Sequence, residues 1–249
     1  MRSTILSNAK QITVVSAAIR NEIKSKLINT NKVPIEVIPM GVDLEMFDDH
    51  AEHKQKVNIK TRLSITKPLL LFVGTLTEKK GVEYLIKAMP KIMKTFPRAK
   101  LRIVGSGTLD KPLKILTKEL FLTNNVIFIG GIPNRQLAQY YDSADILIVP
   151  SIKTKKGDVE GIPVVLMEGL ASSKAIVASN IGGIPEIITH NMNGLLVPEK
   201  DSRSLAQSII TILGDNTLQS KLERGAKISS KNYDLKVVAE KFNKLYSQL

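Results

Sequence analysis

The feature that most constrains this chain of 249 residues is a series of six short hydrophobic runs, separated by longer stretches with a helical pattern. Gly, Pro, Asn or Ser bound the runs, as is typical of strands. Because neighbouring positions are apolar, both faces of each strand are expected to be covered, which is typical of a parallel sheet. The runs are LLLFV (69–73), LRIV (101–104), VIFI (126–129), ILIV (146–149), AIVA (175–178) and LLV (195–197).

The stretches between the runs predict helices. In VEYLIKAMPKIMKTF (82–96), apolar residues recur every three or four positions, and Pro90 predicts a kink. RQLAQYYDSA (135–144) predicts a shorter helix, and SRSLAQSIITIL (202–213) predicts another with a serine cap. The alternation of strand and helix predicts an α/β domain with a doubly wound, Rossmann-like parallel sheet, from about residue 45 to residue 230.

Two flanking segments have other patterns. QITVVSAAIRNEIKSKL (11–27) predicts a strand and then a helix capped by Ser16. The other end predicts a helix from about Asp234 to Ser247. We expect both flanks to pack on the main domain or on something outside it. The face predicted for the last helix consists of Val237, Val238, Phe242 and Tyr246.

Composition restricts the class of function. A net charge of +13 indicates an anionic partner, such as nucleic acid, a phosphorylated small molecule or an acidic membrane surface. Aromatic residues make up only 4%, without Trp, so no specific nucleic-acid partner is expected. The lack of Cys excludes disulfides and thiolate chemistry. MRSTILSNAK has no long apolar core, so we expect a cytoplasmic protein, with peripheral attachment to the inner membrane face as an alternative.

The segment KTKKGDVEGIPVVLMEGLA (153–171) carries two carboxylates eight positions apart, Glu160 and Glu168. It follows the run ILIV, and ligands of doubly wound sheets bind at the carboxyl ends of strands. Pro163 suits the start of a helix to about Ser172, whose amino end would offer N–H groups to a phosphate. Two carboxylates there can accept hydrogen bonds from hydroxyl groups on either side of a phosphate. Each glutamate by itself is more often a solvated or capping residue.

A second candidate loop, GTLTEKKGVEYL (74–85), follows the first run. Gly74 ends the strand, and Lys79 and Lys80 precede the next helix. A lysine at this position can reach a phosphate, although a solvated lysine pair is as good an interpretation of the loop alone. The sequence GSG at 105–107 is a weak dinucleotide signal, and a turn is the better interpretation. The pair His50 and His53 has no third partner nearby, so no metal site is expected.

Seven blocks, taken together, resemble retaining glycosyltransferases of family four, which have the two-domain GT-B fold. The resemblance covers the chain from about residue 8 to its end. It implies that the main domain is the C-terminal half of a GT-B fold. It also implies transfer of a sugar from a UDP- or GDP-sugar to a glycan or lipid-linked acceptor with retention of configuration, without a cofactor. The blocks are FVGTLTEKKGVEYLIKA, LRIVGSG, NVIFIGGI, LAQYYDSADILIVPS, EGIPVVLMEGLA, IGGIPEII and NGLLVPEKD.

The resemblance also implies roles for single residues. Lys80 and Glu160 are the expected catalytic residues: Lys80 pairs with the leaving diphosphate, and Glu160 contacts the sugar hydroxyls. Glu168 holds the ribose hydroxyls, and the segment from Gly130 to Ile132 lines the base. Many relatives have Arg where this chain has Thr75, and Lys79 is a candidate substitute. The full donor-binding set is Gly74, Thr75, Lys79, Lys80, Gly130, Ile132, Glu160, Gly161, Ile162, Pro163, Val164, Val165 and Glu168.

The resemblance divides the chain into three parts. Residues 1–44 are the expected remnant of an N-terminal acceptor domain with its linker, 45–230 form the donor domain, and 231–249 form a helix that crosses back. Activity is therefore expected in a full-length form or with the missing half as a separate chain. The alternatives are a non-catalytic nucleotide-sugar-binding or assembly module, a basic nucleic-acid binder, and a sugar-nucleotide epimerase of the same fold.

Overall fold

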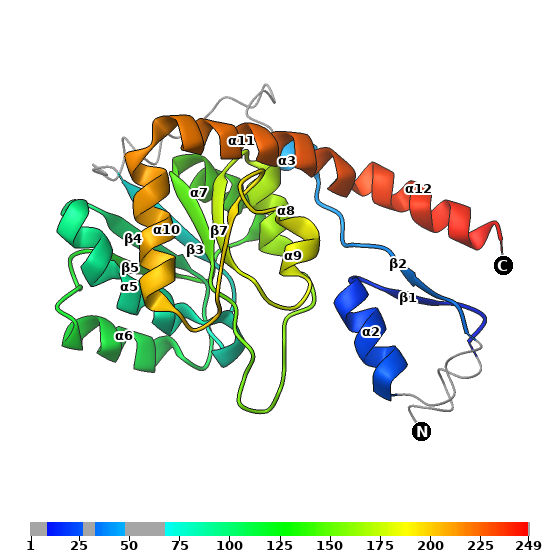
Figure 1. The fold of residues 1–249 in the computed structure, drawn as a ribbon, viewed down its shortest axis with the longest axis horizontal. Helices are drawn as coiled ribbons and strands as arrows, with labels where there is room; N and C mark the ends of the chain where they lie inside the picture. The colour runs from blue at the N-terminus through cyan, green and yellow to red at the C-terminus, as the bar shows by residue number, and fades with distance from the viewer. Residues whose placement is uncertain (1–8, 27–32, 48–67, 249) are drawn as a thin grey trace.

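The structure, a computed structural model, describes residues 9–26, 33–47 and 68–248. Figure 1 shows a large α/β domain and, beside it, a smaller unit that contains segments from both ends of the chain. The large domain contains all six predicted strands, so the predicted fold class is confirmed.

The large domain is built on a six-stranded parallel sheet with the strand order β5-β4-β3-β6-β7-β8. The chain moves outward from β3 to β5 and then returns to place β6 on the other side of β3. The direction of winding therefore reverses between β3 and β6, and ligands of such sheets bind at this switch point. The strands are β3 (Leu69–Val73), β4 (Lys100–Val104), β5 (Val126–Gly130), β6 (Ile146–Val149), β7 (Ala175–Ser179) and β8 (Leu195–Val197).

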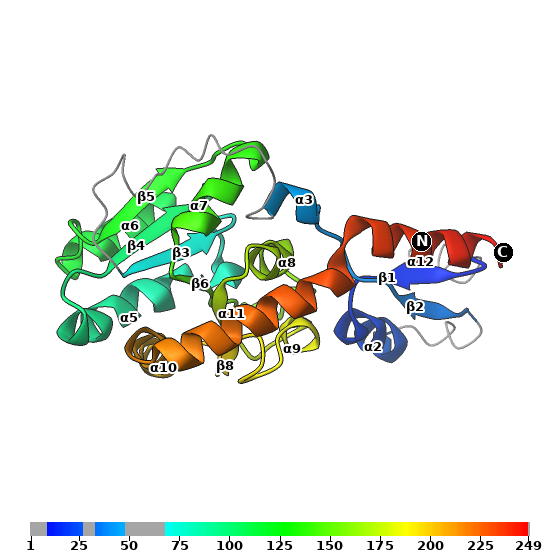
Figure 2. The same ribbon diagram turned by 90° about the horizontal axis from the view of Figure 1, so that it is seen from above.

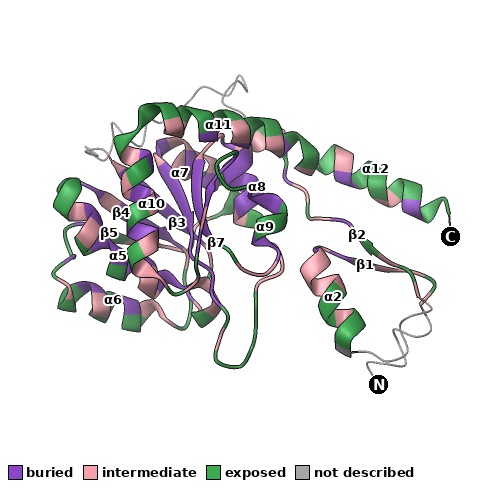
Figure 3. Cartoon of the chain, viewed as in Figure 1, coloured by how far each residue is buried: buried purple, intermediate pink, exposed green. Residues whose placement is uncertain are grey.

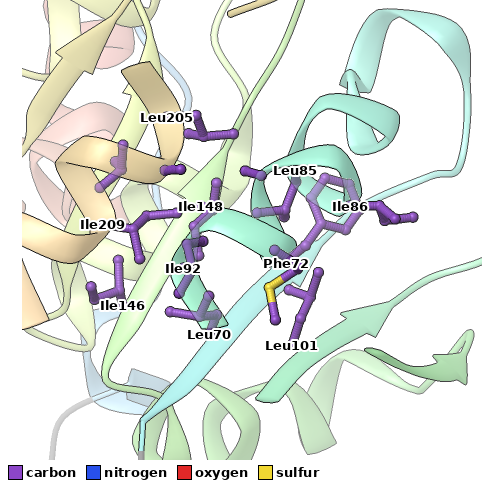
Figure 4. Close-up of a cluster of buried hydrophobic side chains, with 14 of the residues drawn as sticks. Leu70, Phe72, Leu85, Ile86, Ile92, Leu101, Ile146, Ile148, Leu205 and Ile209 are labelled. Carbon is purple, nitrogen blue, oxygen red and sulfur yellow. The ribbon is translucent and has the colours of Figure 1, made fainter. Parts of the chain in front are cut away.

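Helices cover both faces of the sheet, which explains the apolar runs. All residues of β3, β6 and β7 are buried (Figure 3). One core lies between the sheet and α5 (Val82–Thr95), α6 (Asp110–Glu119) and α10 (Ser202–Gly214). Figure 4 shows its centre, where Phe72, Leu85 and Leu205 converge from strand and helix. The other core includes α3 (Leu44–Phe47), α7 (Leu137–Ser143), α8 (Val164–Ala171) and α9 (Ile184–Ile187).

The helices differ from the sequence expectation in a few details. The expected serine cap of α10 is wrong: the Asp201 carboxylate accepts the N–H groups of Arg203 and Ser204, both at 3.0 Å. A charged acceptor is the stronger cap, and Ser204 instead donates its hydroxyl to Asp201. Helix α5 includes Pro90, as expected, and the predicted kink there stays a prediction. Helix α11 (Asn216–Ser230), which the sequence analysis did not identify, packs on α8.

The smaller unit combines β1 (Ile12–Val14), β2 (Ile35–Val37), α2 (Ala17–Lys26) and α12 (Leu235–Tyr246) (Figure 2). The two strands form a parallel pair. The expected Ser16 cap is confirmed, because its hydroxyl oxygen accepts the Ile19 N–H at 3.1 Å. On α12 the expected face is partly wrong: Tyr246 is 66% exposed, and Leu245 packs instead with Ile38 and Val238.

Candidate functional site

The loops that follow β3 and β6 meet at the switch point of the sheet. Gly81 has φ +63°, and a Cβ added there would lie 1.9 Å from the Pro150 carbonyl oxygen. The Ile152 N–H donates to the Lys79 carbonyl at 2.8 Å. Because only glycine tolerates both this conformation and this contact, the two loops are locked side by side.

This contact brings the side chains of Lys80 and Glu160 together. The Lys80 ammonium forms an ion pair with one oxygen of Glu160, and the two side chains are only 12% and 11% exposed. The Ser151 hydroxyl donates to the other carboxylate oxygen at 3.0 Å. Gly74, at the end of β3, lies against the Lys80 side chain, since its Cβ would be 3.7 Å from Lys80 Cε. The cluster therefore places one cation and one fixed carboxylate at the carboxyl ends of β3 and β6.

Glu168 has a different environment, inside α8. It is 9% exposed, and its carboxylate accepts a hydrogen bond of 2.6 Å from the Tyr141 hydroxyl of α7. Burial raises the pKa of the Glu168 carboxyl, and the hydrogen bond from Tyr141 partly opposes this. Burial and the nearby Glu168 charge hold the pKa of Tyr141 well above its usual value. The ring of Phe47 packs edge-on against Tyr141, which fixes the orientation of the phenol.

Between the two glutamates lies the amino end of α8. The helix spans Val164–Ala171, close to the predicted 163–172, with Pro163 as the extended cap residue before it. The Leu166 N–H bonds to the Pro163 carbonyl at 3.0 Å. The N–H groups of Val164 and Val165 have no acceptor within α8, as in any first helical turn. Since Val164 is 40% exposed, this helix end is accessible to a small anion.

The remaining predicted residues differ in their burial. Gly130 ends β5 with φ +84°, and the space where its Cβ would lie is open. Ile132 is half-buried against the second core, and Ile162 is buried there. Thr75 is exposed and Lys79 is half-buried. The structure thus brings Gly74, Lys80 and Glu160 into one cluster, whereas Glu168 is not in contact with that cluster.

Tyr141 and Ser151 were not identified from the sequence. The signal for Tyr141 was weak but present: a tyrosine on the buried face of a helix requires a partner for its hydroxyl. Ser151 lies two positions after the end of the buried strand β6, where a polar side chain is at the ligand end of the sheet.

The remaining sequence features concern histidines, metal sites and membrane-spanning helices. The His190 ring accepts the Leu196 N–H at 3.0 Å, and His50 and His53 lie outside the described residues. Within residues 9–26, 33–47 and 68–248, no three His, Cys, Asp or Glu residues gather in a way that could hold a metal ion. In the same ranges, no helix has the length and apolar character needed to span a membrane.

A hollow of about 550 Å³ lies elsewhere in the molecule, lined among others by Pro68, Asp145 and Lys174. These residues precede β3, β6 and β7, so the hollow lies at the amino ends of the strands. Ligands of doubly wound sheets bind at the opposite ends. The switch-point cluster therefore remains the candidate site.

The fold is that of the GT-B class of glycosyltransferases. Sucrose-phosphate synthase from Thermosynechococcus elongatus superposes with a TM-score of 0.85 and 27% identity, over 99% of this chain and 60% of that one. Anabaena HepE, solved in complex with UDP-glucose, also gives 0.85 at 22% identity, over 100% of this chain and 69% of HepE. The low identity of HepE limits that comparison to the fold.

The chain belongs to the glycosyl transferases group 1 family, whose sequence pattern it matches over residues 53–229. It is 36% identical to the amylovoran biosynthesis glycosyltransferase AmsK of Erwinia amylovora, over 72% of this chain and 42% of AmsK. The chain spans about half the length, or less, of the curated relatives it matches.

Proposed function

We propose that this chain supplies the donor site of a retaining glycosyltransferase. The enzyme would transfer a sugar from a nucleoside diphosphate sugar to a glycan or lipid-linked acceptor. The observation that carries the proposal is the Lys80–Glu160 pair at the switch point, with the amino end of α8 and the buried Glu168 following along the chain. This order offers a carboxylate, a phosphate site and a second carboxylate in succession.

The diphosphate would bind between the two glutamates. Lys80 supplies a compact positive charge, and the free N–H groups of Val164 and Val165 supply hydrogen-bond donors at the positive end of a helix. Together they stabilise the negative charge that grows on the departing diphosphate. Thr75, in place of an arginine, contributes no charge, so Lys79 is the second cation assigned to this part of the site.

The two carboxylates would hold the hydroxyl groups of the donor. At the sugar end (Lys80, Ser151 and Glu160), Glu160 accepts hydrogen bonds from the sugar. At the ribose end (Tyr141 and Glu168), the Glu168 oxygen not bonded to Tyr141 accepts from the ribose. The segment from Gly130 to Ile132 lines the base, where the open space beside Gly130 leaves room for a ring.

In the proposed reaction the bond between the anomeric carbon and the diphosphate oxygen breaks. The acceptor oxygen forms its bond on the same face of the sugar, and its proton passes to the leaving phosphate oxygen. The enzyme then acts by positioning and by electrostatic stabilisation, without an enzyme nucleophile. No cofactor or metal ion is assigned, because Lys80 and the helix end supply the positive charge.

The acceptor would be bound by other parts of the protein. We assign residues 1–44 and 231–249 to the acceptor half, which a full-length form or a separate chain would complete. A cytoplasmic location at the inner membrane face fits the net charge of +13. The chain should co-sediment with anionic vesicles at low salt and not with neutral vesicles. Absence of binding to both would remove the membrane part of the proposal.

Calorimetry with UDP, UDP-glucose, GDP and GDP-mannose tests the donor site. We expect the chain to bind one nucleotide and its sugar derivative, and Glu168→Ala to abolish this binding. Glu83→Ala is the matched control, because Glu83 lies on α5 and its side chain is 46% exposed. A wild-type chain that binds none of the four probes would contradict the proposal.

A second candidate is a non-catalytic nucleotide-sugar-binding or assembly module. It rests on the same switch-point cluster, because binding a donor needs only the contacts around Lys80, Glu160 and Glu168. The two candidates differ in turnover: the module would bind a donor yet never release its sugar, even when the acceptor half is supplied. An epimerase, in contrast, would convert the donor without an acceptor.

A further inference from the structure

Helix α2, in the smaller unit, is capped by a side chain from the large domain. The N–H groups of Ala17 and Ala18 donate to the two carboxylate oxygens of Glu186, at 2.7 and 2.9 Å. The next N–H group, that of Ile19, is accepted by Ser16. The first turn of α2 therefore has its donors satisfied, two of them by a residue 168 or 169 positions away in the chain.

The same turn of α2 packs directly on the loop that carries Glu160. A Cβ added to Gly161 would lie 2.6 Å from Ile19 Cδ1. A Cβ added to Gly183 would lie 2.9 Å from the Cβ of Ser16 and 2.3 Å from the Gly161 carbonyl oxygen. The Gly183 N–H donates to that oxygen at 2.7 Å. The first turn of α2 therefore packs closely against Gly161 and against the segment before Glu186. This contact leaves no room for a side chain at Gly161 or Gly183.

Glu186 lies where three parts of the fold meet. Its own helix, α9, follows β7, and its carboxylate binds the positive end of α2, which favours a negative charge. Its charge also acts on Tyr233, whose pKa is raised first by burial and then by Glu186. Tyr233 accepts the Val42 N–H through its backbone carbonyl, in the turn that leads to α12. By direct contact, this carboxylate joins the N-terminal flank to the large domain through two hydrogen bonds.

We propose that Glu186 is a positioning residue that holds the first turn of α2 on Gly161 and so fixes the sugar end of the donor site. Glu168 and Tyr141 lie outside this contact, so the ribose end does not depend on it. The anchoring of α2 stands on the observed contacts alone, whereas its effect on a bound sugar rests on the proposed function.

Hydrogen exchange in the full chain tests the anchoring. In Glu186→Ala the amides of residues 15–20 should exchange about tenfold faster, as expected for a lost helix cap. Glu186→Gln keeps one acceptor oxygen and should restore part of the protection. Ser16→Ala is the comparison variant, because it removes the cap within α2 and leaves the Glu186 contact in place. Unchanged exchange in Glu186→Ala would overturn the anchoring.

Donor binding tests the positioning. For the nucleotide and nucleotide sugar that the wild-type chain binds, Glu186→Ala should weaken binding of the nucleotide sugar about fivefold, while binding of the nucleotide alone stays within about twofold. Ser16→Ala should leave both affinities unchanged, even where α2 exchanges faster. A parallel loss of nucleotide and nucleotide-sugar binding, or no loss of either, would overturn the role at the sugar end. An equal loss in Ser16→Ala would overturn it as well. A wild-type chain that binds none of the four nucleotide probes refutes the proposed function, and the exchange experiment still decides the anchoring.

Discussion

The two ends of the candidate site are built in different ways. The sugar end joins side chains from two loops, because Lys80 and Ser151 both contact Glu160 where the loops after β3 and β6 meet. The ribose end joins two helices, because Tyr141 of α7 and Glu168 of α8 bond in the interior. Loops can rearrange when a ligand arrives, whereas packed helices hold their side chains in place.

The two glutamates also differ in their electrostatic surroundings. Glu160 already has a cation beside it. Under the proposed function, a diphosphate that attracts Lys80 would release Glu160 to bind a sugar. Glu168 has a hydroxyl as partner, no salt bridge joins it to a basic residue in the part of the chain that the structure describes, and burial raises its pKa. Under the proposed function, the sugar end would respond to the donor, while the ribose end would be organised before binding.

Gly81→Ala should destroy the sugar end by separating the two loops. The added methyl group would overlap the Pro150 carbonyl oxygen in a left-handed backbone conformation. We expect the free energy of unfolding to fall by about 3 kcal/mol. Urea unfolding measures it. Gly214→Ala is the control, since its Cβ meets nothing within 4 Å and no loss is expected. Equal unfolding midpoints for the two variants would show that the loop contact is unimportant.

Lys80→Met should remove the charge that binds the diphosphate while keeping the length of the side chain. UDP affinity is expected to fall about thirtyfold, or about 2 kcal/mol, as for other charge-assisted hydrogen bonds. Lys87→Met is the matched control, because Lys87 is 45% exposed and pairs with Glu83 at 3.7 Å. If both variants bind UDP equally well, the diphosphate does not bind at Lys80.

Much of this architecture could be predicted from the sequence. Continuous apolar runs identified all six strands, because a strand covered on both faces has few polar positions. The expected cover of both faces is wrong for the edge strand β5, where Ile127 is 40% exposed. The resemblance then named Lys80, Glu160 and Glu168 individually. The Lys80–Glu160 pair could not be predicted by local patterns, since 80 positions separate the two residues and only the strand order brings them together.

The errors also have physical reasons. Sequence patterns show which residues are polar but not which neighbour satisfies them. Asp201 therefore displaced the expected serine as a cap, and the partners Tyr141 and Glu186 remained hidden. Helix α11 was missed because its sequence, NTLQSKLERGAKISS, is mostly polar and contains Gly225. That glycine is needed because its Cβ would lie 1.9 Å from the Met192 carbonyl oxygen.

Tyr141→Phe should change the free energy of nucleotide binding at the ribose end by about 1 kcal/mol, the usual value for one hydrogen bond. It should also change the pH dependence of this binding. The hydrogen bond lowers the pKa of Glu168, so its loss raises this pKa further. UDP binding, which uses the ionised carboxylate, should then require a higher pH than in the wild type. Calorimetry at several pH values measures the shift, with the exposed Tyr246→Phe as control.

The raised pKa of Glu168 also determines how the free energy of unfolding depends on pH. Because burial raises the pKa of Glu168, the folded chain holds this proton more tightly than the unfolded chain. The contribution of Glu168 to the free energy of unfolding is therefore present below its unfolded pKa and is lost as the pH rises through its folded pKa. Tyr141→Phe should extend this loss to higher pH. Identical pH profiles for variant and wild type would contradict a coupled Tyr141–Glu168 pair.

Two lysine–glutamate ion pairs that differ in burial should differ in coupling energy. A double-mutant cycle on Lys87 and Glu83, which are about half exposed, should give a coupling of about 0.3–0.5 kcal/mol that salt removes. The same cycle on Lys80 and Glu160 should give a larger coupling that salt reduces less, because both side chains are nearly buried. Saturating UDP should lower only the second coupling, since the diphosphate competes with Glu160 for Lys80. A coupling that UDP leaves unchanged would mean that the sugar end is as rigid as the ribose end.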